Sequence, residues 1–280
     1  MKFVRDVNKM SMENKQFDED LPYIEYTIDG FRGSIMAGEE RHFHVEDALI
    51  DSVQISQDTI NITGIKVFLV KSCKIDETVE KIVTRKVKKF LINICGKMRG
   101  EITRFHLDLN EMYDPCRGGI PCYTMNCNIR IGVETSYAKM YKANVFKDAF
   151  DSELKCQDAE AVYALLYHVI QIENITTRYL MLYEILLGRV GKKHKQQEIT
   201  EYIRNTYNPF HRFGEIGFNK TRKSGKNYEE DSLTYYRNLL GHSEMDESVD
   251  DETIRELSTR ILEVIYYVCS DTENGVRSDE

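Results

Sequence analysis

Near the C-terminus, Arg237 and His242 stand close together in the segment 233–244, LTYYRNLLGHSE. An arginine guanidinium is a permanently charged fork that fits phosphate oxygens, and a histidine can give or take a proton near neutral pH. Phosphodiester cleavage in RNA needs both properties. On an ideal helix, residues five apart point about 140° away from each other, so these side chains meet only where the helix ends or distorts. Gly241 stands directly before the histidine and is a typical helix-ending residue.

The same pair also fits a purely structural interpretation. Arg237 would then be an exposed helix residue, and His242 would cap the C-terminus of the helix, where an imidazolium ion interacts favourably with the helix dipole. Taken alone, the pair favours this interpretation, because motifs this short recur by chance.

The whole string YRNLLGHSE favours the catalytic interpretation over the structural one. It is an apolar-periodic helical segment with Arg237, a polar residue directly after it, and His242 after four intervening residues, and it closely resembles the Arg-x4-His motif of HEPN domains. HEPN domains are all-helical modules found in many RNA-cleaving toxins, abortive-infection proteins and CRISPR-associated ribonucleases. The resemblance covers about residues 156–270. It implies a metal-independent endoribonuclease without a cofactor, in which two protomers bring Arg237 and His242 together at a homodimer interface.

The resemblance also implies a role for each residue. Arg237 would hold the scissile phosphate, and His242 would either deprotonate the ribose 2′-hydroxyl or protonate the leaving 5′-oxygen. Asn238 matches the polar residue after the arginine and would orient His242 or hydrogen-bond the phosphate. The product would be a 2′,3′-cyclic phosphate, and DNA would resist cleavage. The alternative is a noncatalytic dimerisation, interaction or nucleotide-binding module in which Arg237 is structural.

Helical segments surround this motif. Residues 158–172, 177–187 and 251–268 repeat apolar positions at threes and fours, which predicts helices. Residues 174–176 either separate the first two helices or lie within one long helix. The core stripe of the first helix is expected at four positions, with Leu166 beside it: Ala161, Leu165, Val169 and Ile172. The segment 177–187 is apolar around most of its circumference, as in a helix that is buried or lies at a subunit interface.

A basic insertion occupies residues 189–226. It holds ten Lys and Arg residues against three Glu residues, whereas the whole chain has a formal net charge of −8. Such an island beside the Arg/His helix is where RNA phosphates are expected, at six residues above all: Lys192, Lys193, Lys195, Arg212, Arg222 and Lys223. Four interleaved aromatic residues are candidates for base stacking: Tyr207, Phe210, His211 and Phe213. A solvated loop between helices explains the same composition equally well.

The N-terminal half has the pattern of an α+β domain. Residues 23–28, 59–70, 102–109 and 123–134 alternate as strands do, and residues 76–98 have the period of an amphipathic helix capped by Asp76. We therefore expect an α+β chain with four parts. They are a flexible arm over residues 1–20, an α+β sensor or regulatory domain over residues 21–150, a HEPN-like helical domain over residues 151–280, and a disordered tail at 271–280. The boundary is expected near residues 146–157.

Other residues with chemical potential give weaker signals. Cys116, Cys122 and Cys127 with His106 have spacings that match no common zinc site, so no metal is predicted. His42 and His44 are expected in a solvated loop. The seven cysteines, the polar N-terminus and the lack of a long apolar run predict a cytoplasmic protein with reduced thiols and no membrane contact. The expected partners are RNA, a second copy of the chain, and a regulatory partner or trigger of the N-terminal domain.

Overall fold

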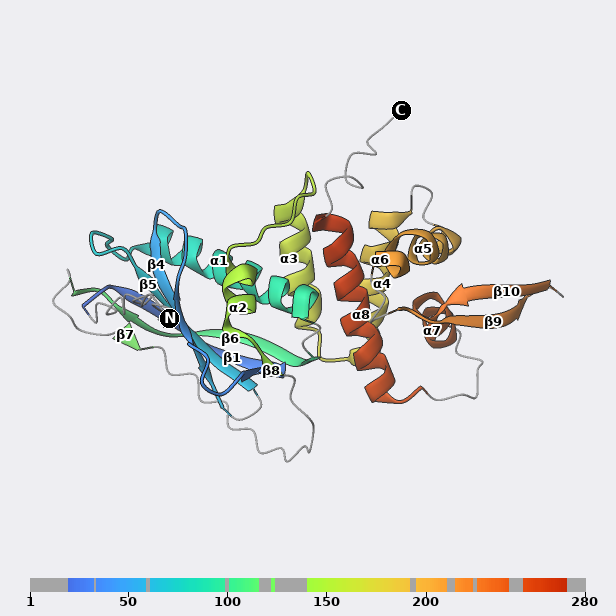
Figure 1. Cartoon of the computed structure of the whole chain (residues 1–280), viewed down its shortest axis with the longest axis horizontal. Helices are drawn as coiled ribbons and strands as arrows, with labels where there is room; N and C mark the ends of the chain where they lie inside the picture. The colour runs from blue at the N-terminus through green and yellow to red at the C-terminus, as the bar shows by residue number, and fades with distance from the viewer. Residues whose placement is uncertain are drawn as a thin grey trace, which may run out of the picture.

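The chain has a β-sheet in its N-terminal half and a group of helices in its C-terminal half, so the predicted α+β class is confirmed (Figure 1). The computed structural model describes residues 20–32, 34–58, 61–98, 101–115, 122–123, 140–191, 195–210, 215–223, 226–241 and 249–270. The arm expected at residues 1–20 and the tail expected at 271–280 lie outside these residues, apart from Asp20. Among the described residues, no helix combines the length and the apolar character that a membrane span requires.

The described strands form an antiparallel sheet of six strands in the order β3-β4-β5-β1-β6-β7. Their bounds are β1 Tyr23–Arg32, β3 His42–His44, β4 Ile50–Gln57, β5 Asn61–Leu69, β6 Glu101–Tyr113 and β7 Cys122–Tyr123. A separate short pair, β2 Ser34–Ile35 and β8 Met140–Tyr141, runs parallel. The strands expected at 23–28, 59–70 and 102–109 are confirmed as β1, β5 and β6. Residues 124–134 of the fourth lie outside the described residues.

Two strands of the six-stranded sheet were not predicted. β4 has the alternating sequence IDSVQISQ, with Ile50, Val53 and Ile55 buried, so a period-2 signal was present. β3 carries His42 and His44, and the loop expected for them is wrong. His42 pairs with Gln54 in the sheet register, and its Nε2 lies 3.0 Å from the hydroxyl of Ser52. The pairing with β4 converts a short polar segment into a strand.

Helix α1, Glu77–Met98, confirms the amphipathic helix expected at 76–98. The Asp76 carboxylate accepts a hydrogen bond from the Val79 amide at 2.8 Å, as expected for the N-cap. The apolar face of α1 is fully buried at Val83, Val87 and Phe90. This face joins the helix to the sheet and to the helices that follow.

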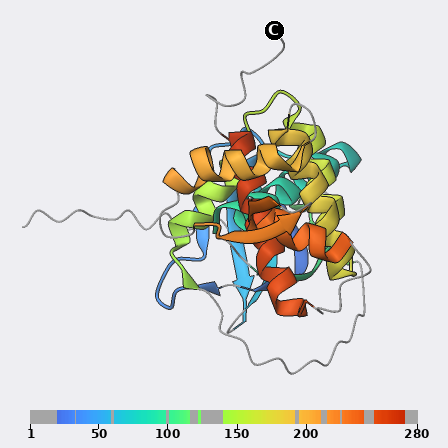
Figure 2. The ribbon, with the colours of Figure 1, turned by 90° about the vertical axis from the view of Figure 1, so that its right-hand side faces the viewer.

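The C-terminal helices are α2 Ala143–Phe150, α3 Ala159–Ile170, α4 Ile175–Val190, α5 Gln196–Tyr202, the π-helical turn η2 Ile203–Tyr207, α6 Asn208–Phe210, α7 Ser232–Gly241 and α8 Asp251–Ser270. α8 packs against both α1 and α4, and Figure 2 views the molecule from this helical end. Asn174 separates α3 from α4, because its side chain caps α4 by accepting from the Thr177 amide at 2.8 Å. One hydrophobic core runs through both halves. The domain boundary stays a prediction.

The expected core stripe of α3 is wrong at two of its four positions. Ala161 is exposed and Leu165 is 42% exposed, whereas the structure buries a neighbouring face. That face consists of Val162, Tyr163, Leu166, Val169 and Ile170. The helix is apolar enough to present either stripe, and its packing against α1, α4 and β6 selects the buried one. Leu165 instead lies on a groove between α3 and α4.

Most of the described residues of the basic insertion lie in helices and strands, so the expectation of a solvated loop is wrong for them. They form α5, η2, α6 and the hairpin of β9 Phe218–Lys223 and β10 Lys226–Asp231, in which Lys223 pairs with Lys226. Ser224 and Gly225 carried the signal of a turn in the sequence, since Ser-Gly is a common turn pair. The hairpin ends directly at the first turn of α7. It therefore links the basic residues to the helix that carries Arg237.

Candidate functional site on helix α7

Helix α7 begins at a buried capping aspartate. Asp231 is fully buried, and one of its carboxylate oxygens accepts a hydrogen bond from the Thr234 amide at 2.9 Å. The other oxygen accepts from the Thr234 hydroxyl at 2.7 Å and from the Thr200 hydroxyl at 2.6 Å. An aspartate three residues before a threonine is a typical helix start, and this signal was visible in the sequence. The cap fixes where α7 begins relative to β10 and α5.

Two tyrosines of α4 hold the same turn from the other side. The Tyr179 hydroxyl donates to the Leu233 carbonyl at 2.6 Å, and the Tyr183 hydroxyl lies 2.9 Å from the Thr234 hydroxyl. Both rings are fully buried, and burial raises the pKa of each phenol well above its ordinary value. Both tyrosines therefore stay neutral and keep their hydroxyl protons. The start of α7 is thus anchored to α4, α5 and β10 through polar contacts.

Arg237 lies one turn further along, on the side of α7 that faces α4. Its Nη2 is 3.2 Å from a carboxylate oxygen of Glu184, and its guanidinium carbon is 5.9 Å from the ring centroid of Tyr183. The Nε atom is buried and has no hydrogen-bond partner among the described residues. The side chain is 31% exposed, whereas that of Glu184 is 56% exposed. The inner nitrogen of the guanidinium is thus buried, and the side chain as a whole is partly exposed.

The end of α7 passes directly beside this guanidinium. A Cβ atom on Gly241 would lie 3.8 Å from Nη1 of Arg237, which is ordinary van der Waals contact. Gly241 stands one helical turn after Arg237 and is the last residue of the helix. His242 follows it and lies outside the described residues. The chain therefore leaves the helix next to the arginine.

Asn238 faces other elements than its neighbour. Its side-chain oxygen accepts from the Gln196 amide at 3.1 Å, and its nitrogen lies 3.4 Å from a carboxylate oxygen of Glu230. Gln196 belongs to α5 and Glu230 to β10, whereas Arg237 turns to α4. Consecutive helix residues differ by about 100° in direction, which accounts for the divergence. The role of Asn238 toward His242 or a phosphate stays a prediction.

The expected RNA-binding residues are described only in part. Lys195 is exposed directly before α5, and the first residue of α5, Gln196, contacts Asn238 of α7. Arg222 and Lys223 lie on β9. Lys192, Lys193 and Arg212 lie outside the described residues. The backbone therefore brings Lys195 and β9 to the same helix as Arg237.

The expected stacking surface is wrong at Tyr207. This residue belongs to η2 and is fully buried, with its ring 5.7 Å from that of Tyr267 in an edge-on arrangement. Phe210 is 73% exposed and is open to solvent. His211 and Phe213 lie outside the described residues. The turn of η2 directs Tyr207 inward against α8, which its aromatic type alone does not reveal.

Sequence reasoning missed the residue that pairs with Arg237. Glu184 stands in the apolar string YEILL of α4, and nothing local marks it as a partner of a residue 53 positions later. No group of three His, Cys, Asp or Glu side chains that could hold a metal ion occurs within the described part of the chain. Residues 116 and 127 and the side chains of His106 and Cys122, considered for zinc, lie outside it.

No family model, curated protein or solved structure matches the chain.

Proposed function

We propose that the chain is a metal-independent endoribonuclease of HEPN type that cleaves RNA by attack of the 2′-hydroxyl, and that it serves as an antiviral-defence or toxin effector. One observation carries the proposal. Arg237 is buried at its inner nitrogen, has a partly exposed side chain, and lies beside the helix end that precedes His242 in the sequence. An arginine preorganised in this way suits a scissile phosphate, because less of its freedom is lost on binding.

The ion pair with Glu184 does not prevent this role. Both side chains are partly exposed, and ion pairs between solvent-exposed groups stabilise by only about 0–1 kcal/mol. A phosphate offers oxygens at a similar position with greater negative charge, so it can replace the carboxylate at low cost. Glu184 would then act as a placeholder that neutralises Arg237 until RNA binds.

The second protomer would cover the groove between α3 and α4. This groove has a volume of about 750 Å³ and includes Leu165 and Met181, two of the exposed large apolar side chains among the described residues. Glu184 lies on the same groove. A copy of the chain that buries Leu165 and Met181 would therefore lie next to Arg237, where a shared site needs it. The N-terminal sheet domain would act as the sensor or regulatory surface.

The chemical roles follow from the residue types. Arg237 would stabilise charge on the nonbridging oxygens as the phosphate becomes pentacoordinate. His242 would transfer the proton, either from the 2′-hydroxyl or to the leaving 5′-oxygen. The nucleophile belongs to the substrate, so the product is a 2′,3′-cyclic phosphate. Lys195 and the basic strand β9 would hold the RNA backbone beside the site.

An RNA cleavage assay with purified full-length chain in EDTA tests the proposal. We expect Arg237→Ala and His242→Ala each to lower kcat by roughly 100-fold or more, and a 2′-deoxy substitution at the cut site to block cleavage. Arg260→Ala is the matched control, because Arg260 is also a partly exposed arginine that pairs with a carboxylate, that of Glu263 at 3.3 Å, and it lies outside the basic insertion. Its kcat should stay within a few-fold of wild type.

Glu184→Gln separates the catalytic role of Arg237 from a structural one. The alternative function is a noncatalytic dimerisation, interaction or nucleotide-binding module, which the Arg237–Glu184 ion pair favours. In that case Arg237→Ala and Glu184→Gln lower the Tm by similar amounts, and neither the wild type nor the variants cleave RNA. In the catalytic case Glu184→Gln keeps cleavage.

Light scattering should show a dimer that Met181→Glu converts to an inactive monomer. Equal cleavage by the wild type, Arg237→Ala and His242→Ala would refute the catalytic roles of Arg237 and His242. Loss of activity in EDTA would point to a metal-dependent enzyme.

A further inference from the structure

A cleft lies between α1 and α3, where the sheet half of the chain meets the helical half. Its volume is about 450 Å³, within the range of roughly 300–1,000 Å³ that is typical of small-molecule sites. α1 contributes one wall, with residues four positions apart, and α3 contributes the other. The chemistry of the two walls differs. α1 supplies all four cations of the lining, and α3 supplies aromatic rings.

The cations of α1 lie on one face of the helix. Lys81, Arg85 and Lys88 are spaced by four and three residues, so they project in the same direction. Lys81 pairs with the exposed Glu77. Arg85 and Lys88 have no ion-pair partner within the described part of the chain, and the Lys88 ammonium instead lies 4.6 Å from the ring centroid of Tyr167. Two positive charges at this cleft are therefore not neutralised by any carboxylate of the described residues.

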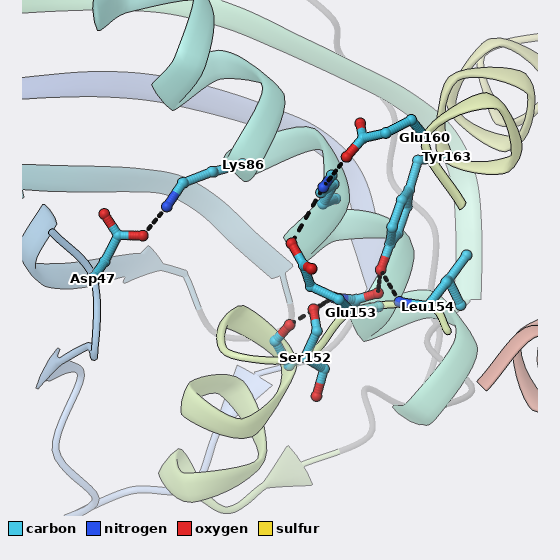
Figure 3. A network of polar contacts seen from close by, with 10 residues as sticks. Asp47, Lys86, Ser152, Glu153, Leu154, Glu160 and Tyr163 are labelled. Atoms are coloured by element: carbon cyan, nitrogen blue, oxygen red, sulfur yellow. Dashed lines mark hydrogen bonds and ion pairs between the residues drawn. The ribbon is translucent and has the colours of Figure 1, made fainter. Parts of the chain in front are cut away.

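The aromatic wall is rigid. The Tyr163 hydroxyl donates to the side chain of Asn93 at 2.8 Å and accepts from the Leu154 amide at 2.9 Å. Figure 3 shows this ring between α1 and the segment before α3. Tyr167 stands one turn further along α3, and burial raises the pKa of its phenol to about 12, so it remains uncharged. The wall thus offers a fixed ring and a neutral, half-buried ring beside free cations.

The remaining charged groups of the cleft largely neutralise each other. Lys89 forms ion pairs with Glu160 and with Glu153, the latter at 3.2 Å, as the dashed lines of Figure 3 indicate for the two carboxylates. Glu80 is the other carboxylate on the lining. Lys81 and Lys89 are thus paired with carboxylates, which leaves Arg85 and Lys88 as the cations of the lining that can meet an anion. A bare anion would use only the cations and leave the aromatic wall without a function.

We propose that the α1–α3 cleft binds a nucleoside phosphate, with the phosphate on Arg85 and Lys88 and the base against Tyr167. Arginine and lysine bind phosphate through charge-assisted hydrogen bonds, and an aromatic ring stacks on any base. When Lys88 turns to the phosphate, the ring face that it covers becomes available to the base. Glu80 and Thr84 supply acceptors for the hydroxyls or amino groups of the nucleoside. The ligand contacts both halves of the chain and so stabilises their junction.

Calorimetry on the full-length chain tests this site independently of RNA cleavage. The probes are ATP, pyrophosphate and adenosine, without added metal. We expect ATP to bind more tightly than either of the others, because it alone uses both walls. Arg85→Ala should weaken ATP and pyrophosphate by roughly tenfold or more. Tyr167→Leu should weaken ATP about tenfold and leave pyrophosphate unchanged, and Tyr167→Phe should bind ATP as wild type does.

Arg41→Ala is the matched control, because Arg41 is an exposed arginine of the same half that does not line the cleft. An equal loss of ATP affinity in Arg41→Ala would show attraction by general charge and overturn the proposal. Absence of ATP binding would also overturn it. The proposal would also be overturned if pyrophosphate bound as tightly as ATP and substitutions of Tyr167 did not change the affinity for ATP, because the site would then bind only the anionic group. An RNA oligonucleotide that binds through Arg85 while ATP does not would assign the surface to RNA instead.

Discussion

Replacing Asp231 with alanine measures how far the buried cap of α7 stabilises the chain. The substitution removes the acceptor of three hydrogen bonds, from the Thr234 amide, the Thr234 hydroxyl and the Thr200 hydroxyl. Loss of an N-cap costs about 1 kcal/mol. Thr200 is 5% exposed, and its hydroxyl would keep no described acceptor, which costs about 1–3 kcal/mol more. Relief of the desolvated carboxylate offsets part of this cost, so we expect a net loss of roughly 2–3 kcal/mol.

The chain contains a closely matched control at α8. Asp250 caps this helix with the same pair of bonds, from the Thr253 amide at 2.8 Å and the Thr253 hydroxyl at 2.7 Å. Asp250 is fully exposed, so water replaces its bonds when the carboxylate is removed. Asp250→Ala should therefore lower the free energy of unfolding by less than Asp231→Ala does.

Urea denaturation of the full-length chain supplies the measurement. The two variants and the wild type should share one m value, so that the change in midpoint reports the change in the free energy of unfolding. Asp231→Asn keeps one acceptor oxygen and should fall between Asp231→Ala and wild type. Equal losses for Asp231→Ala and Asp250→Ala would refute the reasoning, because burial of the network would then add nothing to the cap itself.

Two further perturbations test the packing and the electrostatics of the sheet half. Gly96→Ala should destabilise the chain by about 1–3 kcal/mol in thermal denaturation, because the new Cβ would lie 2.5 Å from Cβ and Cγ of Tyr266 on α8. The cost of this clash outweighs the gain in helix propensity. A raised Tm would contradict this close approach. Burial, helped by His44, lowers the pKa of His42 to about 4, so the unfolded chain binds the proton more tightly between pH 4 and 6.5. The free energy of unfolding should therefore fall by on the order of 1–2 kcal/mol as the pH drops through that window, because partial exposure of His42 screens the effect. In His42→Gln the free energy of unfolding should depend less on pH over the same range. Parallel pH profiles for wild type and His42→Gln would contradict the prediction.

The sequence by itself determined the elements whose pattern is local. The period of α1, the cap at Asp76 and the alternation of β5 predicted structure correctly, because an amphipathic face needs only one apolar side to be buried. The helix of Arg237 was also predicted, since its periodicity and Gly241 define it within a few residues. The side-by-side placement of Arg237 and Gly241 follows from the helical turn alone.

Tertiary structure decided what depends on distant partners. α3 has two apolar stripes, and only the positions of α1, α4 and β6 select the one that is buried. Tyr207 is an aromatic residue in a basic segment, and only its contact with Tyr267 shows that it belongs to the core. Glu184 meets Arg237 because the buried Tyr179 and Tyr183 hydroxyls fix α4 against the first turn of α7. Sequence patterns report the character of each face, whereas long-range packing decides which faces meet.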